Sequence, residues 1–133
     1  MDCIFCKIIS GEIHSLKVYE DQFALVFMDI AADVDGHMLA IPKTHVNSIL
    51  DCDSNTLNSL MAAVKKVSDH CVNVCGYDGV NLLNANGESA GQSVSHFHIH
   101  IIPRNKEDGI DAWPQFGGAK YTIEEIYNNV RML

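Results

Sequence analysis

The stretch "HFHIHII", residues 96–102, places a histidine at every second position and an apolar residue at each position between them. Alternate side chains of a β-strand project to the same face, so His96, His98 and His100 are predicted to share one face while the apolar residues pack on the other. In a chain with 7 histidines among 133 residues, chance produces this alternation in only roughly 2% of cases. The pattern therefore indicates a strand that carries either a metal site or a catalytic imidazole.

Four other short apolar runs have the length and the flanking turn residues of β-strands. The first two form a hairpin through Asp21 and Gln22, and the third follows the turn at Asp35 and Gly36. The fourth is separated from the histidine strand by a turn rich in Gly, Asn and Ser. The five predicted strands cover residues 16–21, 23–30, 37–43, 79–85 and 94–103.

Two further segments have the signals of helices. Apolar residues recur at three- and four-residue steps over residues 57–74, after an N-cap at Asp53 or Ser54. Thr122 and Glu125 occupy capping-box positions, which predicts a short C-terminal helix. The order of elements predicts an α+β fold in which an antiparallel sheet of about five strands is covered by one long helix.

The composition is that of one globular domain spanning residues 1–133. With 47% hydrophobic residues, the chain is long enough to bury its own core, and no low-complexity stretch divides it. The longest apolar run, "FALVFM" (Phe23–Met28), is far too short for a membrane span, and the N-terminus has no long apolar region. We therefore expect a soluble, cytoplasmic protein without a membrane partner.

Charge and cysteine content limit the classes of partner. Lys and Arg number 9 against 17 Asp and Glu, giving a net charge of −8. This balance argues against nucleic acid as a partner, because phosphate affinity there comes from clustered cations. A small anionic ligand is compatible with it, since a local site needs only a few donors. The five unevenly spaced cysteines predict reduced thiols rather than a disulfide framework.

Cys3 and Cys6 form a C-x2-C pair, which has the ligand spacing of a zinc knuckle. No second C-x2-C follows, so a zinc site would need two more ligands, and histidines are the natural source. A thioredoxin-like redox pair is disfavoured because no βαβ unit surrounds the motif, while two ordinary thiols on a frayed terminus are the simplest alternative. The residues alone leave the role of the pair open.

Several segments together resemble the histidine triad (HIT) family of nucleotide-binding hydrolases and transferases. They are "IFCKIISGEI", "VYED", "FMDI", "GHMLAIPKTH" and above all "AGQSVSHFHIHIIPR", which matches the family signature G-Q-S/T-V-x-H-x-H-x-H. The likeness covers most of the chain and is loose only after Arg104. It departs at His14, where relatives commonly have Pro. The resemblance implies the HIT-like fold.

The resemblance assigns different tasks to the three histidines. It implies that His98 is the nucleophile that attacks the α-phosphorus of a nucleotide, and that His100 contacts the phosphate. No organic cofactor is implied. This chain resembles the branch of the family that has an N-terminal C-x2-C. The resemblance implies a structural zinc ion in a closed site, which has no open position for a reactive water. The matching ligands in this chain are Cys3, Cys6, His45 and His96.

The resemblance also implies a binding site for a purine nucleotide. Asp29 would accept hydrogen bonds from the ribose hydroxyls, a role that suits a carboxylate. Gln92 and Ser93 would lie near the phosphate, and Asn84 would be a polar residue of the pocket. Taken without the family, Asp29 is better interpreted as a hairpin or cap carboxylate, Asn84 can be a turn residue, and each residue of the proposed base pocket can equally be ordinary core. Its apolar walls would be Ile4, Phe5, Phe27 and Ile30.

A neutral imidazole such as that of His98 can attack phosphorus without a separate base, because an ordinary histidine pKa of about 6.5 leaves it unprotonated at pH 7. The favoured function is hydrolysis of a nucleoside phosphoramidate. A dinucleoside polyphosphate hydrolase would use the same residues with a different leaving group. A zinc-stabilised, nucleotide-binding scaffold with incidental turnover is the alternative outside enzymes. His37 is given no chemical step.

The HIT relatives that this chain resembles in size form two-fold dimers, so the resemblance implies a homodimer. The segment "DGIDAWPQFGG" (Asp108–Gly118) follows the histidine strand and contains the only tryptophan, Trp113. If this segment crosses to the partner, it would shape the leaving-group side of the pocket. The alternative is a surface loop whose tryptophan packs on its own domain.

Overall fold

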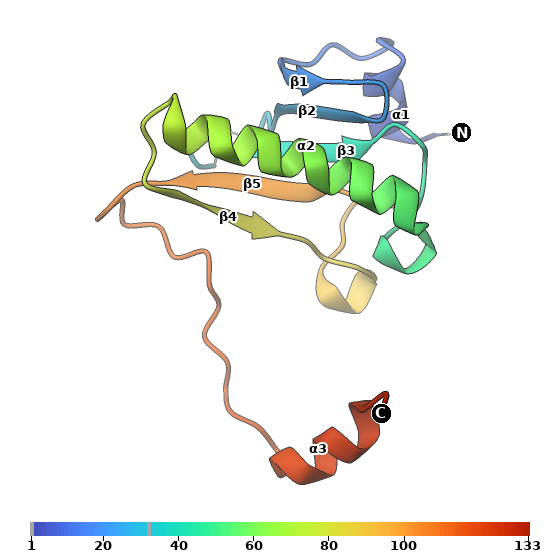
Figure 1. Ribbon diagram of the computed structural model, residues 1–133, viewed down its shortest axis with the longest axis vertical. Coiled ribbons are helices and arrows are strands. Elements are labelled where there is room, and N and C mark those ends of the chain that lie inside the picture. The colour runs from blue at the N-terminus through green and yellow to red at the C-terminus, as the bar shows by residue number, and fades with distance from the viewer. Residues whose placement is uncertain (1, 32) are drawn as a thin grey trace.

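The fold is an antiparallel sheet with one long helix across it, seen in a computed structural model that describes residues 2–31 and 33–133 (Figure 1). The five strands lie in the order β1-β2-β3-β5-β4, and every neighbouring pair is antiparallel. The α+β prediction is therefore confirmed. The elements are α1 (Ile4–Ile9), β1 (Lys17–Glu20), β2 (Ala24–Met28), β3 (Met38–Pro42), η1 (Ile49–Asp51), α2 (Ser54–Asn73), β4 (Gly79–Leu83), η2 (Glu88–Ala90), β5 (Ile99–Arg104) and α3 (Ile123–Val130).

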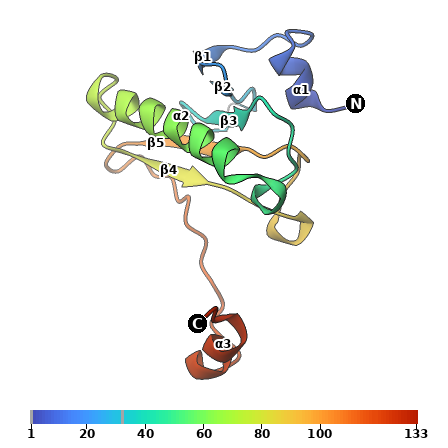
Figure 2. The same ribbon diagram turned by 45° about the vertical axis from the view of Figure 1, so that its right-hand side comes forward.

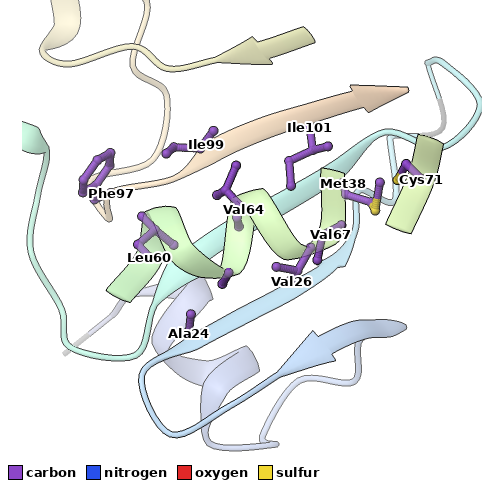
Figure 3. Close-up of a cluster of buried hydrophobic side chains, with 12 residues drawn as sticks. Ala24, Val26, Met38, Leu60, Val64, Val67, Cys71, Phe97, Ile99 and Ile101 are labelled. Atoms are coloured by element: carbon purple, nitrogen blue, oxygen red, sulfur yellow. The ribbon is translucent and has the colours of Figure 1, made fainter. Parts of the chain in front are cut away.

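The long helix α2 covers one face of the sheet. It begins after Asp53, whose side chain accepts from the amide of Thr56, and this confirms one of the two predicted N-caps. Its buried residues recur at helical spacing and pack against alternate residues of β2, β3 and β5 (Figure 3). This core includes Leu60, Val64, Val67, Ala24, Val26, Met38, Ala40, Ile99 and Ile101.

The helix α1 covers the opposite face of the sheet, and the sequence interpretation did not predict it. Phe5 and Ile8 pack on Leu25, Phe27 and neighbouring residues of β2 and β3. Those residues alternate with the ones that contact α2, so both faces of the two central strands are buried. A helix of six residues is too short to show a helical period in the sequence. Such a short helix is stabilised mainly by packing its apolar residues on this face of the sheet.

The strands are shorter than predicted, and the difference matters most at the histidines. β5 begins only at Ile99, so His96 and His98 precede the regular strand rather than lying on it. The neighbouring strand β3 ends at Pro42, which has no N–H to continue a ladder. The chain before β5 bonds elsewhere instead: the amide of Phe97 donates to the carbonyl of Val46 over 2.8 Å.

The predicted alternation nevertheless persists through this irregular segment. Phe97, Ile99 and Ile101 pack in the core under α2, while the ring of Phe5 in α1 lies 5.7 Å from the ring of His96 and 5.3 Å from that of His98. The histidines therefore face α1 and the N-terminus. The prediction of two distinct faces is correct, although the prediction of a strand at His96 and His98 is wrong.

The C-terminal helix α3 lies apart from the sheet in both views, at the end of an extended segment (Figure 2). Its predicted capping box is present: Thr122 accepts from the amide of Glu125, and the Glu125 carboxylate accepts from the amide of Thr122. Ile123, Tyr127 and Val130 are exposed along it. Within residues 2–31 and 33–133, no helix has the length and apolar content needed to cross a bilayer.

Candidate functional site

Two thiols and two imidazoles converge where α1 meets the segment before β5. The Sγ of Cys3 is 3.4 Å from Nδ1 of His96, and the Sγ of Cys6 is 3.4 Å from Nδ1 of His45. The two Nδ1 atoms are 3.0 Å apart. Around a tetrahedral zinc ion, sulfur–nitrogen edges are about 3.6 Å and nitrogen–nitrogen edges about 3.3 Å, from the usual bond lengths. The four side chains thus nearly form a zinc coordination shell.

Hydrogen bonds orient both imidazoles of this cluster for metal binding. Nε2 of His96 donates to the carbonyl of Pro42 over 2.9 Å, and Nε2 of His45 donates to Oδ1 of Asn47 over 3.3 Å. Since a carbonyl oxygen can only accept, the proton of His96 resides on Nε2 and the lone pair of Nδ1 faces the thiols. Second partners of this kind typically fix the tautomer of a metal-bound histidine.

The protonation preferences of the cluster also suit a cation. Burial, followed by the neighbouring Cys3 thiol, raises the pKa of the Cys6 thiol. Burial lowers the pKa of His96, so its imidazole is neutral at neutral pH. Neutral imidazoles are metal ligands, and a cation would stabilise the thiolates that are otherwise disfavoured here. The residues present therefore fit zinc.

His98 is buried beside this cluster with its ring held by the backbone. Its Nδ1 lies 2.7 Å from the carbonyl oxygen of His96, and because the carbonyl can only accept, Nδ1 must carry the proton. The lone pair is therefore on Nε2. The edge-on ring of Phe5 packs against His98, and the carbonyl of His98 accepts from Nδ2 of Asn84 over 2.8 Å. These contacts fix both the tautomer and the orientation of the imidazole.

His100 belongs to a line of hydrogen bonds that reaches Asp33. Its Nδ1 is 2.8 Å from Nε2 of His37, and Nδ1 of His37 is 2.8 Å from Oδ1 of Asp33. His37 was given no chemical step from the sequence. No local signal could have found this contact, because it follows from strand register. Leu39 pairs with His100, so His37, two residues earlier on the same face, is a diagonal neighbour of His100.

Burial lowers the pKa of His100, and the adjacent His98 and His37 lower it further. In the unfolded chain a histidine protonates near pH 6.5. The unfolded state therefore binds more protons between about pH 6.5 and the lowered native pKa, so the free energy of unfolding is expected to fall as the pH decreases through this window. Melting temperatures measured from about pH 8 to pH 5 should decrease less for His100→Gln than for the wild type. Equal decreases in the two proteins would contradict this expectation.

An apolar cavity of about 140 Å³ lies on the α1 side of the sheet. Asp29 lies at its edge, where one carboxylate oxygen accepts from the amide of Ala31 and the other is 3.7 Å from Nε2 of His37. Asp29 is thus both a turn residue and a neighbour of the histidine line. The four apolar residues predicted for a base pocket all line this cavity, although Ile30 is 92% exposed.

The other predicted site residues serve different structural roles. Gln92 uses its whole amide within the loop: Oε1 accepts from the amide of Gly87, and Nε2 donates to the carbonyls of Asn47 and Val94. Asn84 supports the His98 carbonyl. Ser93 is exposed and lines a depression beside His45, on the metal side of the segment. His98 and His100 lie next to each other, and Asp29 lies close to His100.

A second cavity, of about 500 Å³, is bordered by His100. The cavity is bordered by the hydrogen-bonded line of Asp33, His37 and His100, by the loop that follows β4, and by the C-terminal segment. The residues include Asp33, His37, Asn84, His100, Ala112 and Pro114. His37 and His100 therefore border a cavity that the residues flanking Trp113, Ala112 and Pro114, help to form.

The sequence comparisons identify the family to which the chain is similar. The HIT domain matches residues 10–107. Protein hit of Bacillus subtilis is 44% identical over 128 residues, which cover 96% of this chain and 88% of the relative. Adenosine 5'-monophosphoramidase hnt1 of Schizosaccharomyces pombe is 39% identical over 137 residues, which cover 98% of this chain and 100% of the relative.

Solved structures show the same fold. A HIT family protein from Bacillus anthracis has a TM-score of 0.82 at 43% identity, covering 96% of this chain and 92% of that one. A zinc-bound histidine triad family protein from Mycobacterium smegmatis has a TM-score of 0.79 at 33% identity, covering 84% of this chain and 81% of that one.

Proposed function

The chain belongs to the HIT family and is a HIT-type hydrolase, and we propose that it cleaves purine nucleoside phosphoramidates at the α-phosphate through a nucleotidyl-His98 intermediate. The observation that carries this proposal is the tautomer of His98, whose Nδ1–H is bound to the His96 carbonyl. The lone pair on Nε2 is thereby available to attack phosphorus without a separate base. The phosphoramidase activity named for the S. pombe relative supports the choice of substrate.

The proposed reaction consists of two displacements at phosphorus. First, the Nε2 lone pair of His98 attacks the α-phosphorus, the P–N bond to the leaving amine breaks, and the amine takes up a proton as it departs. Second, water attacks the same phosphorus, the bond from phosphorus to Nε2 breaks, and the water loses a proton. The products are a nucleoside monophosphate, the free amine and restored His98. Two such steps are each easier than one direct attack by water.

The line of Asp33, His37 and His100 is suited to move these protons. In the first state His37 carries a proton on both nitrogens, its Nε2–H donates to Nδ1 of His100, and the Nε2–H of His100 can protonate the leaving amine. As that proton departs, the proton on Nε2 of His37 shifts to Nδ1 of His100 and leaves His37 neutral. When Nδ1 of His100 donates to Nε2 of His37 instead, the Nε2 lone pair of His100 can accept a proton from the attacking water. Asp33 accepts from Nδ1 of His37 in both states, at the observed separation of 2.8 Å.

The apolar cavity beside Asp29 is proposed to hold the nucleoside. Phe5, Phe27 and Leu39 line it, so a purine ring would replace water against apolar side chains. Asp29 has one oxygen free of backbone contacts, and this oxygen can accept from a ribose hydroxyl. The nucleotide would then enter the site from the α1 side, with its α-phosphate near His98.

We assign zinc a structural role at Cys3, Cys6, His45 and His96. A bound zinc ion would only cross-link the segments that carry these four ligands, since two thiolates and two imidazoles close its coordination shell. The chain's own contribution is to join α1 to the loop before β5. His96 connects this site to the proposed chemistry, because its carbonyl is the acceptor that holds Nδ1 of His98.

Turnover of two substrates measured side by side tests the proposed function. An adenosine phosphoramidate should be hydrolysed faster than a diadenosine polyphosphate, with AMP as the common product. The reverse order would favour a dinucleoside polyphosphate hydrolase, which shares these residues. If neither substrate is hydrolysed although AMP binds, the chain is a zinc-stabilised nucleotide-binding scaffold.

We further propose that the chain forms a two-fold homodimer whose C-terminal segment reaches the partner's site. Trp113 is 70% exposed, so it does not pack on its own domain as the alternative predicts. α3 stands away from the sheet with apolar side chains exposed, and an isolated helix of this length is marginal in water. Both features are consistent with a surface that becomes buried on pairing.

Trp113→Ala is expected to change the relative kcat/KM values for phosphoramidates with different leaving amines while leaving AMP affinity nearly unchanged. The reason is that a residue on the leaving-group side contacts one part of the substrate and not the nucleoside. Phe116→Ala, which removes another exposed aromatic side chain of the same segment, is the matched control. Sedimentation showing a monomer at micromolar concentration, or unchanged amine preference, would contradict the proposal.

A further inference from the structure

A second group of possible metal ligands lies in the part of the chain that the zinc proposal does not use. It consists of Asp29, His37 and His100, whose ligand atoms all lie within 4.8 Å of one another. We propose that these three side chains form a second, open site for a divalent transition-metal ion such as zinc, separate from the Cys3 cluster. A metal ion in this site would prevent the nucleotide from binding.

The geometry of the group resembles that of the thiol-containing cluster. Nε2 of His37 and Nδ1 of His100 are 2.8 Å apart, compared with 3.0 Å for the two Nδ1 atoms of His45 and His96. The third atom, Oδ2 of Asp29, is 3.7 Å from Nε2 of His37. Nitrogen and oxygen ligands of one zinc ion lie about 3.3 Å from each other. Side-chain shifts of a few tenths of an ångström would bring these two separations to that value.

His37 is already oriented as a metal ligand. Its Nδ1 donates to the carboxylate of Asp33, which leaves the lone pair of Nε2 directed toward His100 and Asp29. A carboxylate bound to the remote nitrogen of a histidine is the usual outer partner at metal sites, because it fixes the ring and increases the basicity of the ligand nitrogen. The side chain of His37 is also buried, so little conformational freedom is lost on binding.

The ligand set distinguishes the two sites chemically. The first site has two thiolates and two imidazoles, which close a tetrahedron. The second has two imidazoles and one carboxylate, so a fourth position stays open for water or a phosphate oxygen. Its nitrogen and oxygen donors bind zinc and cobalt, whereas the thiolates of the first site favour softer ions more strongly. The second site should therefore fill after the first.

Binding replaces a shared proton with a metal ion and involves no redox step. The hydrogen bond between His37 and His100 requires a proton on one of the two facing nitrogens. The metal needs a lone pair on both, so the proton on Nδ1 of His100 moves through solvent to its Nε2. The imidazole stays neutral throughout.

A metal ion here would compete with the nucleotide. It would occupy the oxygen of Asp29 that is proposed to bind the ribose and would interrupt the proposed proton line at His100. This inhibitory consequence rests on the proposed function, whereas the binding of the metal does not. A second equivalent of zinc is therefore expected to inhibit hydrolysis, while the first equivalent stabilises the fold.

Equilibrium dialysis of the full chain against zinc alone tests the site directly. The wild type should bind two ions per chain, while Asp29→Asn and His37→Ala should each bind one tightly and lose the second or bind it about tenfold more weakly or worse. His70→Ala, which removes an exposed histidine of α2, should still bind two. A wild type that binds one ion, or variants of Asp29 and His37 that both keep two of unchanged affinity, would overturn the proposal.

Cobalt titration provides a readout that also reports on folding. The first equivalent should produce the intense thiolate-to-cobalt charge-transfer bands of the Cys3 cluster, and the second only weak ligand-field bands, since its ligands contain no sulfur. If His37→Ala loses both signals, it has unfolded, and Asp29→Asn then decides the result. AMP should lower the affinity for the second cobalt ion only. If the second ion binds but ignores AMP, the proposed nucleotide position is wrong while the metal site stands.

Discussion

Replacing His98 with alanine is expected to lower kcat/KM for an adenosine phosphoramidate by roughly 10⁴-fold or more, the size of effect seen when a nucleophile is removed. The reason is that the variant lacks the Nε2 lone pair proposed to attack phosphorus, which the bond from Nδ1–H to the His96 carbonyl fixes in the wild type. Thermal stability and AMP affinity should change much less, because His98 belongs to neither proposed metal site. Stopped assays of the two purified proteins over a range of substrate concentrations measure the effect.

Two controls separate the loss of a nucleophile from a general defect. His70→Ala removes an exposed imidazole on α2 and should retain full activity. His98→Gln preserves much of the side-chain volume against Phe5 and should be as inactive as the alanine variant. Rapidly quenched wild-type enzyme should show a nucleotidyl adduct by intact mass, which both His98 variants lack. An active alanine variant would refute the assignment of the nucleophile.

Cys3→Ser is expected to lose the first, tightly bound zinc ion and to lower the melting temperature by about 10 °C, which for a chain of this size corresponds to roughly 3 kcal/mol of unfolding free energy. The thiol of Cys3 serves two functions, since it also caps α1 by accepting from the amide of Cys6. Serine retains the cap and removes the soft ligand. Metal analysis and thermal denaturation of the purified variant provide the two measurements.

The matched control for the thiol is Cys75→Ser, at an exposed cysteine beyond the end of α2. The Cys75→Ser variant should bind zinc as the wild type does and should have the same melting temperature. His45→Ala should behave as Cys3→Ser does, because it removes a different ligand of the same ion. If zinc restored turnover to a folded, metal-free protein without raising its melting temperature, the ion would have a catalytic role and the structural assignment would be wrong.

Periodicity and turn chemistry predicted most of the architecture correctly. The apolar runs of β2 and β3, the N-cap at Asp53 and the capping box at Thr122 depend on neighbours in the chain, and the structure contains all of them. The helix α1 was missed because its six residues have no amphipathic period of their own. It exists because one face of the sheet presents Leu25, Phe27 and Leu39 for burial, a surface that forms only after the strands have paired.

Among the site residues, sequence and structure contributed different information. The residue types and spacing of the histidine segment predicted the two-faced arrangement and, through the family signature, the tasks of the three histidines. The tautomer of His98 depends on the carbonyl of His96, and this bond forms within the irregular segment that precedes β5. The placement of Gln92 near the phosphate stays a prediction, and the bonds that its half-buried amide makes to loop carbonyls were not predicted, because they depend on how the loop folds.

By itself, the sequence determined which side chains are available and which face each occupies, because both follow from residue identity and local backbone period. Only the tertiary structure decided which of them meet. His37 and His100 are 63 residues apart and Cys3 and His96 are 93 apart, and each pair comes into contact through sheet register or the packing of α1. Contacts at such separations depend on the free energy of the whole core, so no local pattern encodes them.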